Sequence, residues 1–140
     1  MSARAFLDIN VLVYTFDSRE PAKRERALDL VERALAERSG FISFQVVQEF
    51  LNVATRRFER PMAAADAHAF LDGVLAPLCE VMSSIDLYRR ALLVADRYGY
   101  GLYDALVVAA ALQGGATSLL SEDLQHGQVI DGLTIRDPFR

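Results

Sequence analysis

The stretch LYDALVVAAALQGGATSLLS, residues 102–121, sets the architecture that we expect for this chain. Its first part, LYDALVVAAAL, is almost continuously apolar and predicts a buried helix. Gly114 and Gly115 then end this helix. The last part, TSLLS, is a short apolar run that predicts a buried strand. A helix that leads directly into a strand is the repeating unit of α/β proteins.

The same alternation of helix and strand extends through the rest of the chain. Apolar residues at helical spacing predict helices, and the short apolar runs between them predict strands. The predicted strands are RAFLD (4–8), GFIS (40–43), CEVMS (79–83), TSLLS (117–121) and LTIRD (133–137). The predicted helices cover residues 21–38, 44–58, 61–75, 83–99 and 102–112. We therefore expect an α/β fold of three layers, in which helices cover both faces of a mainly parallel sheet.

Four carboxylates are predicted to meet at one edge of this sheet. In α/β proteins with parallel sheets, sites form where strands end and helices begin. Asp8 follows the first strand and Asp123 follows the fourth, and we expect these two strands at the centre of the sheet. Glu49 lies on a polar stripe of the helix after the second strand, and Asp104 opens the apolar helix. Taken singly, each acid also has a structural explanation as a helix cap, a turn residue or a surface residue.

Acids gathered in one place repel one another, and a divalent cation removes that conflict. Carboxylates without nearby cysteine or histidine suit hard ions, Mg²⁺ or Mn²⁺. Such an ion polarises a phosphoryl oxygen and lowers the pKa of water, which is the chemistry of phosphodiester hydrolysis. The net charge of −4 argues weakly against nucleic-acid binding by a broad basic face, but a metal would itself attract phosphate. The four acids therefore predict a metal-dependent phosphodiesterase.

Composition limits the other possibilities. A length of 140 residues predicts one domain, residues 1–140. The hydrophobic share of 52% is enough for a core and an additional apolar interface, and the candidate interface residues are Phe41, Phe44 and Phe58. No run approaches the roughly 18 apolar residues that cross a bilayer, and the N-terminus lacks a signal-peptide layout. We expect a cytoplasmic protein with no membrane partner. Lys23 is the only lysine, so the Gly-Lys pair of a P-loop is absent.

The ordered segments FLDINVLVY, SFQVVQEFLNV, GLYDALVVAAAL, LLSEDLQHG and GLTIRDPF resemble the PIN-domain family, particularly the VapC-type toxins of bacterial toxin–antitoxin pairs. The resemblance covers residues 5–139. It implies a five-stranded parallel sheet and an Mg²⁺- or Mn²⁺-dependent endoribonuclease. It also implies a homodimer that a cognate antitoxin holds inactive. This chain departs from the family at Ile9, where threonine is common.

The resemblance also assigns roles to individual residues. It implies that the metal is held by Asp8, Glu49, Asp104 and Asp123. It implies that supporting polar groups orient these carboxylates, and matches them to Asn10, Ser43 and Ser121.

Two alternative classes fit the sequence poorly. A haloacid-dehalogenase-like phosphatase needs a second aspartate where Asn10 stands, and a receiver domain needs a lysine late in the chain, but the only lysine is Lys23. A catalytically idle PIN-like module that only binds a protein partner is the more serious rival. The cluster Arg56, Arg57 and Arg60 is either a solvated helix end or a contact for RNA or antitoxin.

Overall fold

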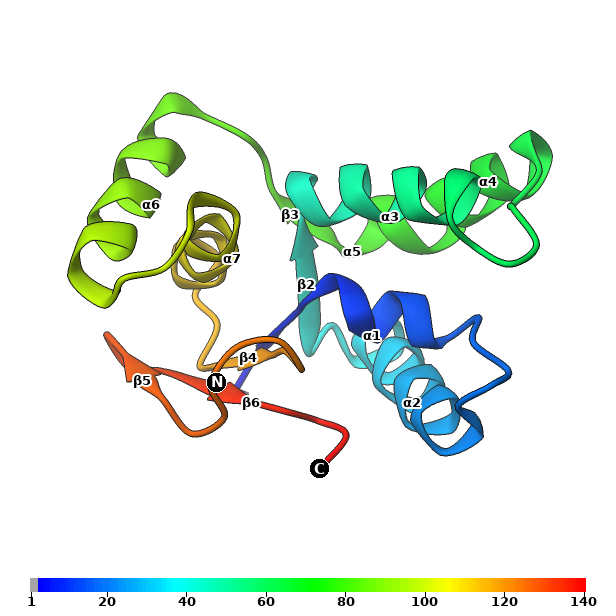
Figure 1. Cartoon of the computed structure of the whole chain (residues 1–140), viewed down its shortest axis with the longest axis horizontal. Helices are drawn as coiled ribbons and strands as arrows, with labels where there is room; N and C mark the ends of the chain where they lie inside the picture. The colour runs from blue at the N-terminus through cyan, green and yellow to red at the C-terminus, as the bar shows by residue number, and fades with distance from the viewer. Residues whose placement is uncertain (1–2) are drawn as a thin grey trace.

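The computed structural model describes residues 3–140, which form a central sheet of six strands flanked by helices (Figure 1). The strand order is β3-β2-β1-β4-β6-β5, and every neighbouring pair is parallel except β5 and β6. The strands are β1 (Ala5–Leu7), β2 (Gly40–Ser43), β3 (Cys79–Val81), β4 (Ser118–Leu120), β5 (Val129–Ile130) and β6 (Leu133–Arg136). The predicted α/β class and the central position of β1 and β4 are confirmed.

The sixth strand corrects the expected count of five. β5 is only two residues long and pairs with β6 in an antiparallel hairpin, with Ile130 opposite Leu133. Asp131 and Gly132 join the two strands, and both have positive φ values, 49° and 85°. An Asp-Gly pair between apolar residues is a strong hairpin signal because glycine adopts such angles freely. The Asp-Gly pair therefore indicates a hairpin, but a strand of two residues is too short to be predicted from its apolar pattern.

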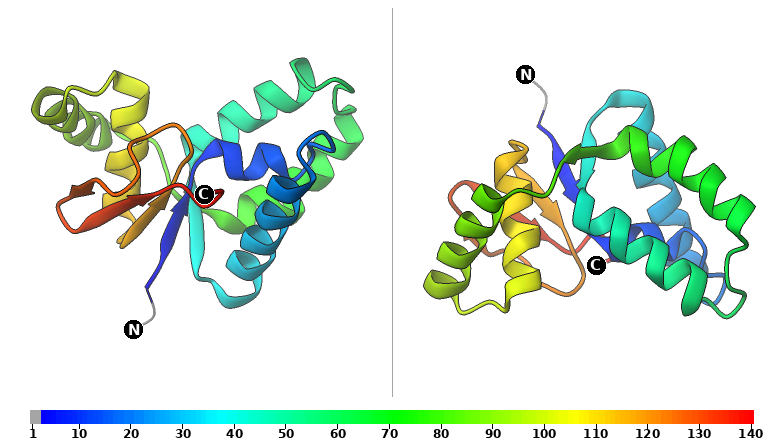
Figure 2. Two further views of the ribbon diagram at one scale, coloured as in Figure 1. Left: turned by 60° about the horizontal axis from the view of Figure 1, so that its bottom comes forward. Right: turned by 90° about the horizontal axis from the view of Figure 1, so that it is seen from above.

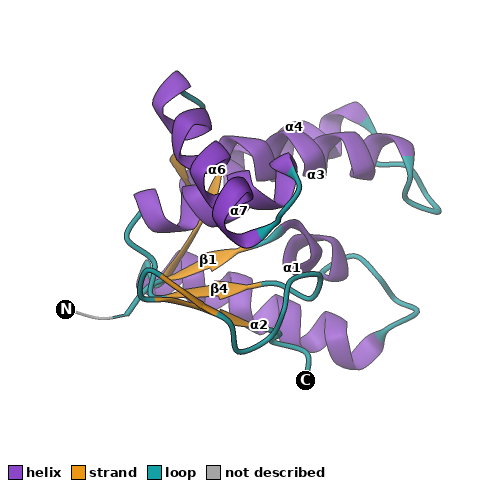
Figure 3. Cartoon of the chain, turned by 60° about the vertical axis from the view of Figure 1, so that its left-hand side comes forward, coloured by secondary structure: helices purple, strands orange, loops and turns teal. Residues whose placement is uncertain are grey.

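The helices are α1 (Ile9–Tyr14), α2 (Pro21–Glu37), α3 (Phe44–Arg56), α4 (Ala64–Phe70), α5 (Ala76–Leu78), α6 (Ile85–Tyr98) and α7 (Leu102–Gln113). A π-helical turn, Leu71–Leu75, joins α4 to α5. Helix α7 lies on one face of the sheet and α2 on the opposite face (Figure 3), and α6 packs alongside α7 (Figure 2). No helix in the part of the chain that the structure describes is long and apolar enough to span a bilayer.

Helix α7 packs between the sheet and α6, and it can be buried there because its sequence is apolar around the whole helix. Every residue from Ala105 to Ala111 is buried. The helix stops at Gly114, where a Cβ would lie 2.2 Å from the Phe41 ring, so only glycine fits. Phe41 itself is fully buried against Phe6, with ring centroids 5.5 Å apart. The proposal that Phe41 contributes to an interface is therefore wrong, because its side chain belongs to the core.

The helices differ from the prediction in several places, and α3, for example, ends at Arg56 rather than at residue 58. The predicted helix at 61–75 begins only at Ala64 and ends in the π-helical turn. Ser84, rather than Ser83 at the start of the predicted segment, caps α6 by accepting a hydrogen bond from the Leu87 amide. Helix α1 was not predicted, because six residues rich in branched side chains give no helical period to read.

Candidate active site

The centre of the candidate site is the junction of β1 and α1. Because Leu7 pairs with Leu120 in parallel register, Asp8 and Ser121 leave the sheet side by side. The Asp8 carboxylate accepts two hydrogen bonds of 2.8 Å, one from the Ile9 amide and one from the Ser121 hydroxyl. Asp8 thus caps α1, whereas the structural explanation expected for this residue was a turn, and its bond from Ser121 also fixes it against the end of β4.

Asp8 is a buried acid in an unfavourable electrostatic setting. Burial raises its pKa to about 6, and the negative charges of Asp123 and Glu49 push the pKa in the same direction. The hydrogen bonds from Ser121 and Ile9 oppose this shift. A buried carboxylate usually has a cationic partner. Among residues 3–140, none of the six ion pairs includes Asp8 or any other of the four predicted acids.

Asp123 is exposed and lies just beyond β4. The Asn10 amide donates a 2.8 Å hydrogen bond to Asp123 Oδ2, and the Asp123 amide donates one of 3.3 Å to the Ser121 hydroxyl. Ser121 therefore contacts both acids. Asn10 and Ser121 hold the two carboxylates that follow the central strands.

Glu49 and Asp104 come from the two helices that face this edge. Gln45 lies one turn before Glu49 on α3, and its amide donates to Glu49 Oε1 at 2.8 Å and to the Tyr103 carbonyl at 3.4 Å. Asp104 lies exposed in the first turn of α7, where no side-chain hydrogen bond caps the helix. Gln45 thus ties the Glu49 side chain to the backbone immediately before Asp104.

The four acids do not close into one ligand set. Within the range 3–140, no group of three or more Asp, Glu, His or Cys side chains is close enough together to hold a metal. Asp8, Asp123 and Glu49 interact through their charges, whereas Asp104 is linked to Glu49 only through Gln45. The donors at this edge are carboxylate oxygens without a basic partner, and in chemical type, though not in their present spacing, they suit a hard divalent cation.

Ser43 contacts none of the acids in the hydrogen bonds that the structure records. Its buried hydroxyl accepts from the Val46 amide at 3.4 Å and so caps α3. Ser43 therefore acts on Glu49 only by fixing the start of the helix that carries it.

A model of the PIN-domain family matches residues 5–130 of this chain. This chain belongs to the PIN-domain family. It is 34% identical over 130 residues to Ribonuclease VapC7 of Mycobacterium tuberculosis, covering 89% of this chain and 86% of that protein.

Solved structures share the PIN fold with this chain. A toxin–antitoxin complex from Klebsiella pneumoniae contains a chain with a TM-score of 0.67 and 19% identity, covering 93% of this chain and 95% of that one. The DNA-bound VapBC from Salmonella typhimurium gives a TM-score of 0.66 at 20% identity, covering 98% and 99%. At these identities, the comparisons establish the fold.

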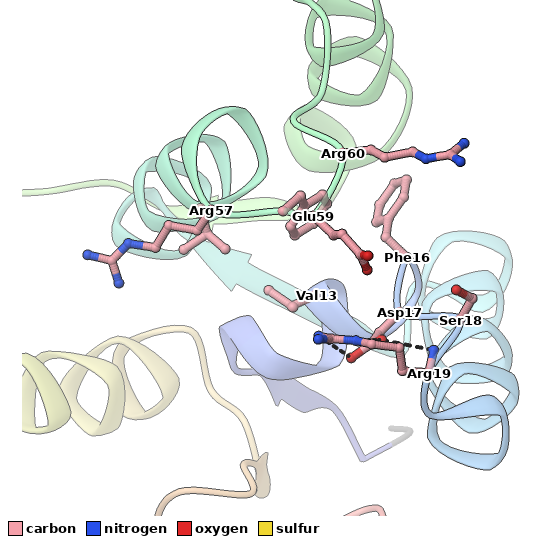
Figure 4. A pocket seen from close by; sticks show the side chains of 10 residues that line it. Val13, Phe16, Asp17, Ser18, Arg19, Arg57, Glu59 and Arg60 are labelled. Carbon is pink, nitrogen blue, oxygen red and sulfur yellow. Dashed lines mark hydrogen bonds and ion pairs between the residues drawn. The ribbon is translucent and has the colours of Figure 1, made fainter.

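The arginine cluster of this PIN domain lies apart from the acids. Arg56, Arg57 and Arg60 are exposed at and beyond the end of α3. Arg57 and Arg60 border a cavity of about 850 Å³ between this segment and the end of α1, together with Phe16 (Figure 4). None of the four acids lines that cavity.

Sequence reasoning missed three side chains around the site. Gln45 belongs to the polar stripe that carries Glu49, and a spacing of four residues on a helix could have indicated their contact. Tyr14 and Lys23 both contact Glu122, the neighbour of Asp123. No local pattern signals these contacts, because they join segments about 100 residues apart.

Proposed function

We propose that this PIN domain is a divalent-metal-dependent endoribonuclease and the toxin of a toxin–antitoxin pair. The observation that carries the proposal is Asp8, a buried carboxylate with a raised pKa, two acidic neighbours and no basic partner within residues 3–140. The 34% identity of this chain to Ribonuclease VapC7 supports RNA as the substrate. The folded protein would be more stable with a neutral side chain at this position, so the presence of an acid indicates a functional role.

The residues of this chain have distinct parts in the proposed reaction. Asp8 and Asp123 would hold the metal from the sheet edge, and Glu49 and Asp104 would do so from the flanking helices. When bound, Mg²⁺ or Mn²⁺ supplies the Lewis acid needed for phosphodiester hydrolysis. Ser121 and the Ile9 amide orient Asp8, and Asn10 orients Asp123. Fixed carboxylates favour metal binding because less reorganisation is needed.

Cleavage of RNA by the purified protein tests the activity. Cleavage is measured with Mg²⁺, Mn²⁺ or EDTA, beside Asp8→Asn and Asp104→Asn prepared identically. We expect metal-dependent cleavage that both variants lose, which also excludes a contaminating nuclease. Cleavage by Asp8→Asn at the wild-type rate would overturn the four-acid proposal.

A second candidate is a binding module without catalysis. It is favoured by the absence of a closed ligand set among residues 3–140. It predicts a folded wild type that neither binds Mn²⁺ in calorimetry nor cleaves RNA. Mn²⁺ binding that is lost in Asp8→Asn would reject it.

We propose that an antitoxin binds in the aromatic groove, defined by Phe16, Met62, Phe58, Phe70 and Val74. This groove encloses about 620 Å³. The Phe16 ring lies 5.7 Å from that of Phe58 and 5.1 Å from that of Phe70, yet its side chain is 43% exposed. An exposed aromatic cluster of this kind is typical of protein interfaces.

The charges beside the aromatic groove indicate what the bound segment contains. Arg60 and Asp66 line the groove, and Arg57 lines the adjacent cavity that shares Phe16, with its side chain pointing away from Arg60 (Figure 4). Neither arginine forms an ion pair within the described part of the chain. A segment with apolar side chains for the groove and acidic ones for these arginines fits this surface. The two structural neighbours reported above come from toxin–antitoxin complexes, which supports this class of partner.

We further propose that the chain forms a homodimer through the apolar stripe, defined by Ile85, Tyr88 and Leu92. These residues are spaced to lie on one side of α6, and their side chains are 67%, 42% and 60% exposed. The opposite side of α6 packs on α7 through Leu87, Ala91 and Val94. Apolar residues on the outer side of a helix favour contact with a second copy.

A further inference from the structure

Three consecutive residues after β4 are each held by the β1–α1 unit. Ser121 donates to Asp8, Asp123 accepts from Asn10, and Glu122 accepts from the Tyr14 hydroxyl at 2.7 Å. Asn10 and Tyr14 lie one turn apart on α1, so the same side of this helix contacts two neighbouring carboxylates. The segment 121–125 is irregular, and these side-chain bonds add to the Ser121 amide bond to the Arg136 carbonyl and the buried Leu124 side chain in holding it.

Lys23 reaches this segment from α2. Its ammonium group donates to Glu122 Oε2 at 2.8 Å and to the Tyr14 hydroxyl at 3.3 Å. It also lies 5.0 Å from the centroid of the Tyr14 ring and 5.9 Å from that of Phe139. The only lysine of the chain thus donates two hydrogen bonds, and the rings of Tyr14 and Phe139 partly shield it from water.

The strength of this cluster exceeds that of an isolated surface ion pair. The side chains of Lys23 and Glu122 are 33% and 25% exposed, so water screens their attraction only in part. The shared hydroxyl of Tyr14 makes the three groups a network, in which each bond supports the others. An exposed pair such as Arg33 and Asp29, at 59% and 53%, contributes little by comparison.

The network also resolves an ambiguity between two adjacent acids. Glu122 and Asp123 are both carboxylates, and either could turn toward Asp8 if the segment moved. Lys23 attracts Glu122 toward α2, and Asn10 holds Asp123 separately. Without Lys23, Glu122 would be an unbalanced charge beside Asp123.

We propose that the Glu122 clamp, defined as Tyr14, Lys23 and Glu122, positions Asp123 for metal binding. The proposal rests on the proposed metal-dependent function. None of the three residues needs to touch the metal or the RNA. Each is a positioning residue that acts through the backbone of the segment carrying Asp123.

Lys23→Met tests the clamp, because it removes the charge and keeps much of the side chain's length. Amide hydrogen exchange of residues 119–126 in the metal-free protein reports whether the segment is held. Mn²⁺ titration then reports the quality of the site. We expect faster exchange confined to this segment and Mn²⁺ binding weakened about three- to tenfold, below the 10–100-fold typical of direct ligand supports. Saturating Mn²⁺ should restore RNA cleavage, which a general structural defect would not allow.

Matched variants make the result specific. Arg33→Met removes a cation from the same helix at an exposed ion pair and should change neither measurement. Lys23→Arg should retain Mn²⁺ binding. Tyr14→Phe removes one hydroxyl and keeps the ring, so it tests the clamp even if Lys23→Met fails to fold. Exchange and Mn²⁺ affinity in Tyr14→Phe and a folded Lys23→Met that match those of Arg33→Met would overturn the clamp.

Failure of the clamp and failure of the proposed function are distinguishable. A wild type that binds no Mn²⁺ overturns the metal-dependent function, whereas hydrogen exchange in the metal-free protein still decides whether Lys23 holds the segment. Unchanged exchange in Lys23→Met overturns the clamp even where the wild type binds Mn²⁺ and cleaves RNA.

Discussion

Ser121 and Asp8 are 113 positions apart in the sequence, and the hydroxyl of Ser121 donates a 2.8 Å hydrogen bond to Asp8 Oδ2. The bond joins the ends of the two central strands. It also lowers the pKa of Asp8 against the stronger effect of burial, so it favours the ionised form that a metal requires.

Ser121→Ala is therefore expected to weaken Mn²⁺ binding by about tenfold, the lower end for supports of metal ligands. Without the hydroxyl, the pKa of Asp8 rises above about 6, and the metal must displace a proton more often. The defect should accordingly be larger at pH 6 than at pH 8 in calorimetric titrations. Ser84→Ala is the matched control, because it also removes a serine hydrogen bond but lies at the start of α6. A defect of equal size at both pH values would contradict this account.

Asp8→Asn is expected to stabilise the metal-free protein above pH 6. The pKa of Asp8 is raised from 3.8 to about 6 on folding, so the folded state binds more protons than the unfolded state between these values. Stability of the wild type therefore falls as pH rises through that window, by up to about 3 kcal/mol for this group. Asparagine does not ionise, and it also caps helices well.

Denaturant unfolding at pH 4 and pH 7.5 measures this difference. The variant's advantage should be small at pH 4 and larger at pH 7.5. Added Mn²⁺ should stabilise the wild type at pH 7.5 and leave Asp8→Asn unchanged. A destabilised variant at pH 7.5 would show that Asp8 serves the fold rather than a metal.

The sheet-edge positions of Asp8 and Asp123 could be predicted because local apolar patterns identify the strands that precede them. The apolar runs before Asp8 and Asp123 identify two short strands, and the central strands of an α/β sheet end at one edge. The relation of Asp104 to the others could not be predicted as closely. It depends on how α7 packs and on the bridge from Gln45 to the Tyr103 carbonyl, which no sequence spacing encodes.

The Glu122 clamp could not be predicted for a different reason. It requires α1, whose six residues carry no readable helical period. Because α1 was not predicted, nothing in the sequence placed Asn10 and Tyr14 on the same side of a helix. No partner could therefore be assigned to Lys23. The hairpin at β5 was readable in principle, since Asp131 and Gly132 form a recognisable turn pair.

Phe16→Ser is expected to weaken antitoxin binding by about tenfold or more, since buried aromatic residues dominate many interfaces. The partner to test is the protein encoded by the neighbouring reading frame, with affinity measured by calorimetry. Phe44→Ser is the matched control, because Phe44 is 42% exposed but does not line the aromatic groove. RNA cleavage by Phe16→Ser without the partner should remain at the wild-type level. Equal losses in both variants would place the partner elsewhere.

Leu92→Asp is expected to convert a homodimer into a monomer, because each interface would bury two added carboxylates without partners. Light scattering after size-exclusion chromatography measures the mass of each species. Leu92 lies in the apolar stripe on the outer side of α6, with its side chain 60% exposed, so the substitution should leave the thermal unfolding midpoint of the monomer nearly unchanged. Val129→Asp adds the same charge at an equally exposed apolar residue, 59% exposed on β5, and should remain dimeric. A dimeric Leu92→Asp would show that the apolar stripe is not the interface, and a monomeric wild type would contradict the dimer itself.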